Sequence, residues 1–175
     1  MNEKEILKLI KEARLHNKDS FTKLIRYYMK DLYKVSISIL NNDEDAADAI
    51  QDTILSCWEK IHTLENPKYF KTWLTRILIN NCYDIRTQRM KFASYDEEIY
   101  SEPEEPMDSG DINYELKEAL ATLDEKYRVP MLLFYGQGFR IREIADILHM
   151  PMGTVQTRLT RGRKQLEKYY GIDRE

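Results

Sequence analysis

The sequence predicts an all-α protein made of two small helical domains. Gly and Pro, which interrupt helices, number only 6 and 5 in 175 residues. Apolar residues recur at three- and four-residue spacing along almost the whole chain, and no stretch alternates as a strand does. A chain of 175 residues has room for one ordinary domain or two small ones. The helical pattern breaks between residues 93 and 111, which favours two domains.

The break in the pattern is an acidic segment. Residues 93–111 contain eight acidic residues and no Lys or Arg, with Pro103, Pro106 and Gly110 among them. Such a composition cannot bury enough apolar surface to offset the entropy lost on ordering. We therefore expect a flexible acidic linker at 93–111 that joins an N-terminal domain, residues 1–92, to a C-terminal domain, residues 112–175.

Helices are predicted in the N-terminal domain near 3–16, 19–40, 43–61 and 67–91. Asn42 or Asp43 can cap the third helix, and the acids of its first turn suit the positive end of the helix dipole. The second and fourth helices have the clearest apolar faces: Phe21, Leu24, Ile25, Tyr28, Leu32, Val35 and Ile39 in one, and Phe70, Trp73, Leu74, Ile77 and Leu78 in the other.

The C-terminal domain is also predicted to be helical. Amphipathic helices are expected at 112–123 and 126–135, where Pro130 either starts the second helix or kinks it. A short helix follows at 141–148. After a tight turn over residues 149–153, Thr154 is expected to cap a last helix that runs to about Tyr169.

The last two of these helices have the layout of a helix-turn-helix. Ala145 is small enough to let a second helix approach closely, and Val155 and Leu159 point toward the first helix. Between Arg140 and Lys168 there are seven basic residues and three acidic ones. Arg suits bidentate contacts with guanine, and Gln can pair with adenine, so the second helix is predicted to read the major groove. The alternative is a solvated amphipathic helix at the end of a bundle.

The N-terminal domain contains two segments of opposite charge. Residues 43–52 contain five acidic residues and no basic one, and Asp45, Asp48 and Asp52 recur at helical spacing. Residues 68–91 contain six basic residues and one acid, interleaved with aromatic rings, a pattern that can hold a single nucleic-acid strand. Both patterns also occur on solvated helix faces, and Trp73 lies on the apolar face, where core packing competes with a base contact.

Composition excludes several functional classes. The charged N-terminus lacks the apolar core of a signal peptide, and no run reaches the about 18 apolar residues that a membrane span needs, so we expect a cytoplasmic protein. The net charge of -3 argues against a general nucleic-acid binder. Cys57 and Cys82 lie in apolar patterns as buried thiols, the three His are scattered, and no metal site is expected. With no phosphate loop or nucleophile motif, no enzyme and no cofactor are expected either.

The helix-turn-helix block resembles a known family. Leu123-Asp124-Glu125-Lys126-Tyr127-Arg128, then Ile144-Ala145, then residues 153–166 (GTVQTRLTRGRKQL) are similar to the promoter-binding C-terminal domain of extracytoplasmic-function sigma factors. Two departures are Gly162, where the family usually has Ala, and His149, where it usually has Gly. The resemblance implies that the minus-thirty-five element is read by Thr154, Gln156, Thr157, Arg158, Arg161 and Lys164.

The N-terminal blocks resemble the same family. The 45–58 block is similar to the helix that binds a coiled coil of the polymerase, which implies Asp45, Asp48, Gln51 and Asp52 as contacts. The 70–84 block is similar to the minus-ten recognition helix, preceded by a loop that in relatives captures a flipped base. The minus-ten candidates are Asn66, Lys71, Trp73, Arg76, Asn80, Arg86 and Arg89.

Taken together, the resemblance implies a sigma factor that binds bacterial core RNA polymerase and directs promoter-specific initiation in a stress or cell-envelope response. Its expected partners are the polymerase, promoter DNA as duplex and as melted strand, and a membrane-anchored anti-sigma factor that holds it at the inner face of the membrane; no small-molecule substrate is expected. The alternative function is a stand-alone helix-turn-helix transcriptional regulator, against which the acidic 45–52 segment argues.

Overall fold

The computed structural model describes residues 1–93 and 114–171, which form two compact units. Each unit is helical, and together they confirm the predicted all-α fold of two small domains. Ala93, which the sequence analysis assigns to the linker, is the last residue of a helix, and the rest of that predicted linker, 94–111, lies outside the described residues. No helix in the described ranges is long and apolar enough to cross a bilayer.

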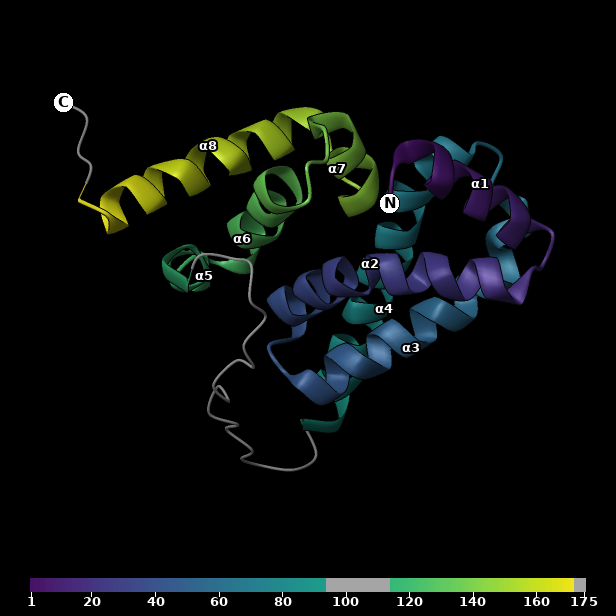
Figure 1. Cartoon of the computed structure of the whole chain (residues 1–175). Helices are drawn as coiled ribbons and strands as arrows, with labels where there is room; N and C mark the ends of the chain where they lie inside the picture. The colour runs from purple at the N-terminus through teal and green to yellow at the C-terminus, as the bar shows by residue number, and fades with distance from the viewer. Residues whose placement is uncertain (94–113, 172–175) are drawn as a thin grey trace. The chain divides into compact units, whose positions relative to one another are not determined.

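The N-terminal unit is built from four α-helices (Figure 1). They are α1 (Glu3–Arg14), α2 (Lys18–Leu40), α3 (Asp43–Lys60) and α4 (Phe70–Ala93). Two short 3₁₀ turns, Ile61–Thr63 and Pro67–Tyr69, connect α3 to α4. The predicted 67–91 helix is therefore a turn followed by a helix, because Pro67 and the Asn66 cap close a separate 3₁₀ turn first.

Asparagine caps define where the first three helices begin. Asn2, Asn17 and Asn42 each accept a hydrogen bond from the backbone three residues on, at 2.9 Å in every case. Between α2 and α3 the chain turns at Asn41, which adopts a left-handed conformation with φ 49°. Of the two caps that the sequence allows for α3, the structure selects Asn42.

A single core holds the N-terminal unit together, because α2 packs on α1, α3 and α4. Its largest fully buried side chains include Leu24, Phe70, Leu74 and Leu78. Trp58 packs its ring against Phe21, with 4.9 Å between centroids. The core therefore fixes α3 and α4 side by side, which positions the charged segments that each helix carries.

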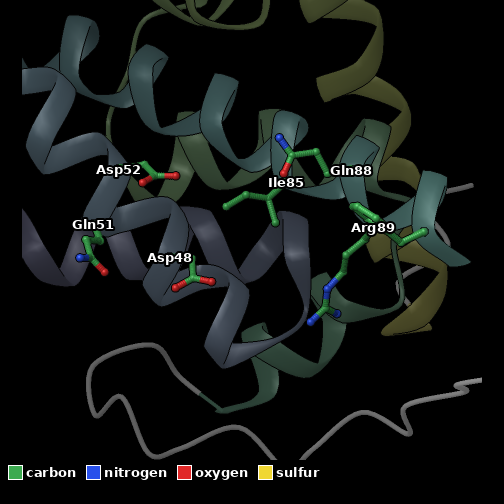
Figure 2. A pocket seen from close by; sticks show the side chains of 7 residues that line it. Asp48, Gln51, Asp52, Ile85, Gln88 and Arg89 are labelled. Carbon is green, nitrogen blue, oxygen red and sulfur yellow. The ribbon is translucent and has the colours of Figure 1, made fainter.

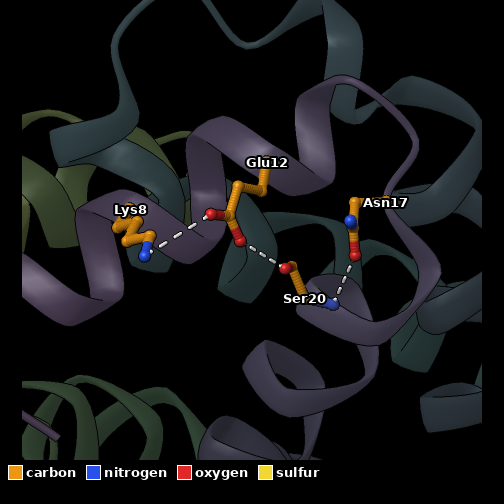
Figure 3. A network of polar contacts seen from close by, with 4 residues as sticks. All are labelled: Lys8, Glu12, Asn17 and Ser20. Atoms are coloured by element: carbon orange, nitrogen blue, oxygen red, sulfur yellow. Dashed lines mark hydrogen bonds and ion pairs between the residues drawn. The ribbon is translucent and has the colours of Figure 1, made fainter.

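A polar network closes the corner between α1 and α2 (Figure 3). The hydroxyl of Ser20 donates a hydrogen bond to the carboxylate of Glu12, whose other oxygen lies 3.9 Å from Lys8 Nζ. Asn17 caps α2 beside them. The network ties the start of α2 to the last turn of α1.

The C-terminal unit contains α5 (Tyr114–Ala121), α6 (Glu125–Met131), α7 (Ile141–Leu148) and α8 (Met152–Tyr169). A π-helical turn, Leu132–Gly136, continues α6. Pro130 lies inside α6, so it does not start the helix, and the wider π turn follows two residues later. The buried residues Leu133, Ile144, Ile147 and Val155 form the centre of this unit.

The turn between α7 and α8 is that of a helix-turn-helix. His149 occupies the left-handed region with φ 52° and ψ 47°, as its place in the predicted tight turn requires. α8 begins at Met152 after Pro151, so the prediction that Thr154 caps the helix is wrong: Thr154 lies in its first turn. Val155 and Leu159 are buried, which leaves the basic side chains of α8 on its outer side.

Candidate functional site

The acidic face of α3, which we define as Asp48, Gln51 and Asp52, is exposed. All three side chains line one wall of an open cleft of about 380 Å³ (Figure 2). The opposite wall comes from α4 and consists of Ile85, Gln88, Arg89 and Phe92. The structure therefore brings together three of the four predicted polymerase contacts, with carboxylate and amide oxygens accessible to a basic partner.

Asp45, the fourth predicted polymerase contact, is not among the residues that line this cleft. Its side chain is only 10% exposed, and its Oδ2 lies 2.9 Å from Nε of Arg89. Burial raises the pKa of the Asp45 carboxyl above its usual range, and the charge of Arg89 acts in the opposite direction. Asp45 is therefore held inside the N-terminal unit by a residue that the sequence assigns to DNA.

A second, apolar groove lies between α2 and α3. It has a volume of about 320 Å³ and includes Met29, Tyr33, Ile54 and Leu55 in its lining. Gln51 lines both this groove and the cleft, so the two hollows adjoin at the acidic face. Sequence reasoning missed Met29 and Leu55, although an exposed apolar side chain on a helix whose apolar stripe lies elsewhere could have indicated them.

Tyr33 and Asp43 lie at the edge of this apolar groove. The Tyr33 hydroxyl donates a hydrogen bond of 2.6 Å to Oδ1 of Asp43. This bond, together with burial, raises the pKa of Tyr33 to about 12. The bond ties α2 to the first turn of α3, directly beside the acidic residues.

The minus-ten candidates between residues 66 and 73 differ in how far their side chains are exposed. Asn66 is exposed, but its Oδ1 accepts a hydrogen bond of 3.0 Å from the backbone N–H of Lys68, so it also caps the 3₁₀ turn. Lys71 lies 3.7 Å from Asp31 of α2. Trp73 is half-buried, and its ring centroid lies 6.1 Å from that of Phe70. Trp73 therefore belongs only partly to the core, and only part of its ring is accessible for stacking on a base.

The remaining minus-ten candidates follow along α4. Arg76 is half-buried and Asn80 is exposed. Arg86 places its guanidinium over the ring of Tyr83, 4.8 Å from the centroid. Arg89 is paired with Asp45.

α4 is tied to α3 by a partly buried hydrogen bond that the sequence did not reveal. Nδ2 of Asn81 donates to Oγ1 of Thr53 at 3.0 Å, and Thr53 in turn donates to the carbonyl of Ala49 at 2.6 Å. Because Thr53 is fully buried, this contact orients the two helices specifically.

The minus-thirty-five candidates lie on α8. Gln156, Thr157, Arg161 and Lys164 are exposed, and their sequence spacing of three to four residues keeps the last three on one side of the helix. Thr157 donates a hydrogen bond of 2.9 Å to the carbonyl of Gly153, which leaves its methyl group and the acceptor lone pairs of its hydroxyl oxygen for a base. Thr154 and Arg158 are half-buried.

Two kinds of reactive site are relevant to the described residues, a metal cluster and an activated thiol. No group of three or more His, Cys, Asp or Glu in residues 1–93 and 114–171 could hold a metal ion. Both cysteines are buried and neither forms a disulfide, and burial raises the pKa of Cys57 to about 12. A thiol that stays protonated at neutral pH is a poor nucleophile.

Two family models match the chain in the order that the sequence motifs indicate. The Sigma-70 region 2 model matches residues 24–92, and the Sigma-70 region 4 model matches residues 114–166. The first match includes the acidic face and α4, and the second includes the helix-turn-helix.

Curated relatives and solved structures agree with these models. The chain is 30% identical to the ECF RNA polymerase sigma factor SigW of Bacillus subtilis, over 93% of this chain and 95% of that protein. It is 28% identical to RNA polymerase sigma factor SigV of the same organism, over 78% of this chain and 82% of that protein. The sigma factor RpoE of Bartonella quintana, solved with the anti-sigma factor NepR, superposes with a TM-score of 0.74 at 27% identity, covering 88% of this chain and 98% of that one. The matched regions, their order and the fold show that the chain belongs to the extracytoplasmic-function (ECF) family of RNA polymerase sigma factors.

Proposed function

We propose that this sigma factor, which directs transcription initiation, docks on bacterial core RNA polymerase through the acidic face of α3. The observation that carries the proposal is the exposure of Asp48, Gln51 and Asp52 together on one wall of the cleft. An exposed cluster of carboxylates and an amide favours fast, oriented association with a basic helix. The apolar groove beside Gln51 supplies the surface whose burial stabilises the complex.

We also propose which surfaces meet the promoter. α4 faces the minus-ten element, where Asn80 is exposed, Arg76 is half-exposed and Trp73 is half-exposed for stacking on an unpaired base. α8 enters the major groove at the minus-thirty-five element, with Gln156 at base edges and Arg161 and Lys164 on phosphates. Because both domains belong to one chain, binding at one element raises the effective concentration of the other domain at its own.

The expected regulation is a further part of the proposal. Sigma factor RpoE of Bartonella quintana was solved as a complex with an anti-sigma factor. By analogy, an anti-sigma factor anchored in the membrane holds the present chain inactive at the inner face of the membrane, in a cytoplasmic response to stress. The chain acts by binding alone and has no enzymatic activity of its own.

The test is run-off transcription from a genomic DNA library with bacterial core polymerase, with and without this protein. New start sites should appear and should vanish in the Asp48→Asn, Gln51→Ala, Asp52→Asn variant. The matched control is Asp19→Asn with Glu59→Gln, which removes the same charge from exposed positions of the same unit. If no transcripts appear while the protein alone binds one duplex sequence tightly, the chain acts as a stand-alone regulator and the proposal fails.

A further inference from the structure

The second half of α4 extends beyond the core of the N-terminal unit. The buried side chains of α4 end at Cys82, and residues 83–93 of this helix have none. Arg86 and Arg89, two of the minus-ten candidates, both lie in this part of the helix. A helix segment with little apolar contact needs another attachment if its basic side chains are to meet DNA in a fixed geometry.

The Asp45–Arg89 ion pair is such an attachment. It joins the first turn of α3 to the second half of α4 through a contact of 2.9 Å between Oδ2 and Nε. The two partners are unequal, since the side chain of Asp45 is 10% exposed and that of Arg89 is 53% exposed. Because the buried carboxylate of Asp45 contacts Nε, it holds the guanidinium of Arg89 in one orientation. The more exposed part of that guanidinium stays available to an anion.

We propose that Asp45 is a positioning residue for the DNA-facing half of α4, which it holds through Arg89, and that it is not a contact for the polymerase. The proposal rests on the proposed function, because it gives one of the four family-matched residues to promoter opening and leaves the other three to polymerase binding. Accessibility supports the division: Asp48, Gln51 and Asp52 are exposed, whereas a partner could reach little of Asp45.

A purely structural role for Asp45 is the competing explanation. An acid in the first turn stabilises a helix through its dipole, and Asp43 and Glu44 offer the same interaction in the same turn. Burial, however, raises the pKa of Asp45, so the ionised carboxylate is less favourable in the folded protein than in the unfolded chain. Replacing Asp45 by the neutral, isosteric Asn should therefore not lower the melting temperature, although a loss of function is expected.

The experiment uses the full chain with core polymerase and a promoter obtained from the run-off assay. It compares wild type with Asp45→Asn, Arg89→Ala, the double variant, and Arg89→Lys, which keeps a cation near the carboxylate. Glu44→Gln is the matched control, because it removes the same charge from an exposed neighbour on the same turn. Two quantities are measured: the affinity for core polymerase, and the fraction of promoter opened by saturating holoenzyme, read by permanganate reactivity of unpaired thymines.

Asp45→Asn and Arg89→Ala should each lower promoter opening about tenfold relative to Glu44→Gln, and the double variant should be no worse than either. Affinity for the polymerase should stay within about twofold of wild type in all of them, and Arg89→Lys should recover part of the opening. The single variants share one phenotype because each removes the same contact. Should Asp45→Asn not fold, Arg89→Ala carries the test, since its side chain is half-exposed.

Two outcomes would overturn the proposal. A loss of polymerase affinity in Asp45→Asn is the first. If Arg89→Ala does not share the loss, Asp45 is a polymerase contact after all; if Arg89→Ala shares it, the pair belongs to the polymerase site, since Arg89 lines the same cleft as the acidic face. Losses in opening that multiply in the double variant would show that the two residues act independently. Failure of the proposed function itself looks different, because then the Asp48→Asn, Gln51→Ala, Asp52→Asn variant would bind core polymerase as well as wild type does.

Discussion

Gly162 of α8 lies against Met131 of α6. A Cβ added at residue 162 would be 3.0 Å from Cγ and 3.2 Å from Sδ of Met131, both closer than ordinary van der Waals contact. Glycine in a helix interior costs about 1 kcal/mol relative to alanine. A side chain larger than Gly at residue 162 therefore requires Met131 to shift by a few tenths of an ångström.

This contact predicts a coupled effect of two substitutions. Gly162→Ala should change the stability of the C-terminal unit by less than about 0.5 kcal/mol, because the gain in helix propensity is offset by displacement of Met131. In a Met131→Ala background the same substitution should stabilise by about 1 kcal/mol. Hydrogen exchange of peptides from α6 and α8 measures the change in stability in both backgrounds. Gly153→Ala is the control, since an added Cβ there meets nothing within 4 Å and should be additive with Met131→Ala.

The Asn81–Thr53 hydrogen bond predicts a loss of stability in the N-terminal unit. Thr53→Val keeps the shape of the side chain but leaves the amide of Asn81 without its acceptor, at a cost of about 1–3 kcal/mol. Thr63→Val, whose hydroxyl bonds an exposed backbone carbonyl, should cost less than about 0.5 kcal/mol. Urea denaturation followed by tryptophan fluorescence reports this unit alone, since both tryptophans, Trp58 and Trp73, lie in it. Equal effects of the two substitutions would show that the bond between α3 and α4 contributes nothing.

The raised pKa of Tyr33 predicts a change in stability at alkaline pH. The pKa rises from the ordinary 10.0 to about 12 in the folded protein, so the neutral hydroxyl is favoured by folding. Its contribution is fully present below pH 10 and is lost as the pH rises through about 12. Tyr33→Phe should therefore lower stability at neutral pH and reduce the decline above pH 10. Tyr28, whose pKa is also about 12, keeps its ionisation, so an ultraviolet titration should lose the late step of Tyr33 and retain that of Tyr28.

The proposed role of α8 predicts two different losses. Gln156→Ala should weaken holoenzyme binding by about 1–3 kcal/mol at the matched minus-thirty-five sequence and little at others. Arg161→Ala should weaken binding at all sequences and reduce the slope of log affinity against log salt by about 1. Gln165→Ala, also exposed on α8, is the control for the first. If Gln156→Ala, like Arg161→Ala, weakened holoenzyme binding by the same amount at every DNA sequence, α8 would not read bases.

Most of the secondary structure was determined by the sequence alone. Periodic apolar residues predicted the helices of both units, and the predicted 141–148 helix has the observed bounds of α7. The tight turn over residues 149–153 was also predicted, and the left-handed backbone of His149 lies in it. These features depend on residues close together in the chain, whose spacing sets which side chains share a face.

The tertiary structure decided which charged residues are available for binding. Spacing grouped Asp45 with Asp48 and Asp52, but the packing of α4 on α3 buries Asp45 against Arg89 and leaves the other two exposed. It likewise set the Asn81–Thr53 bond and the contact of Gly162 with Met131. Helical periodicity gives the face of a side chain but not the residue opposite it, because that residue comes from another helix whose register is set by the packing of the whole core.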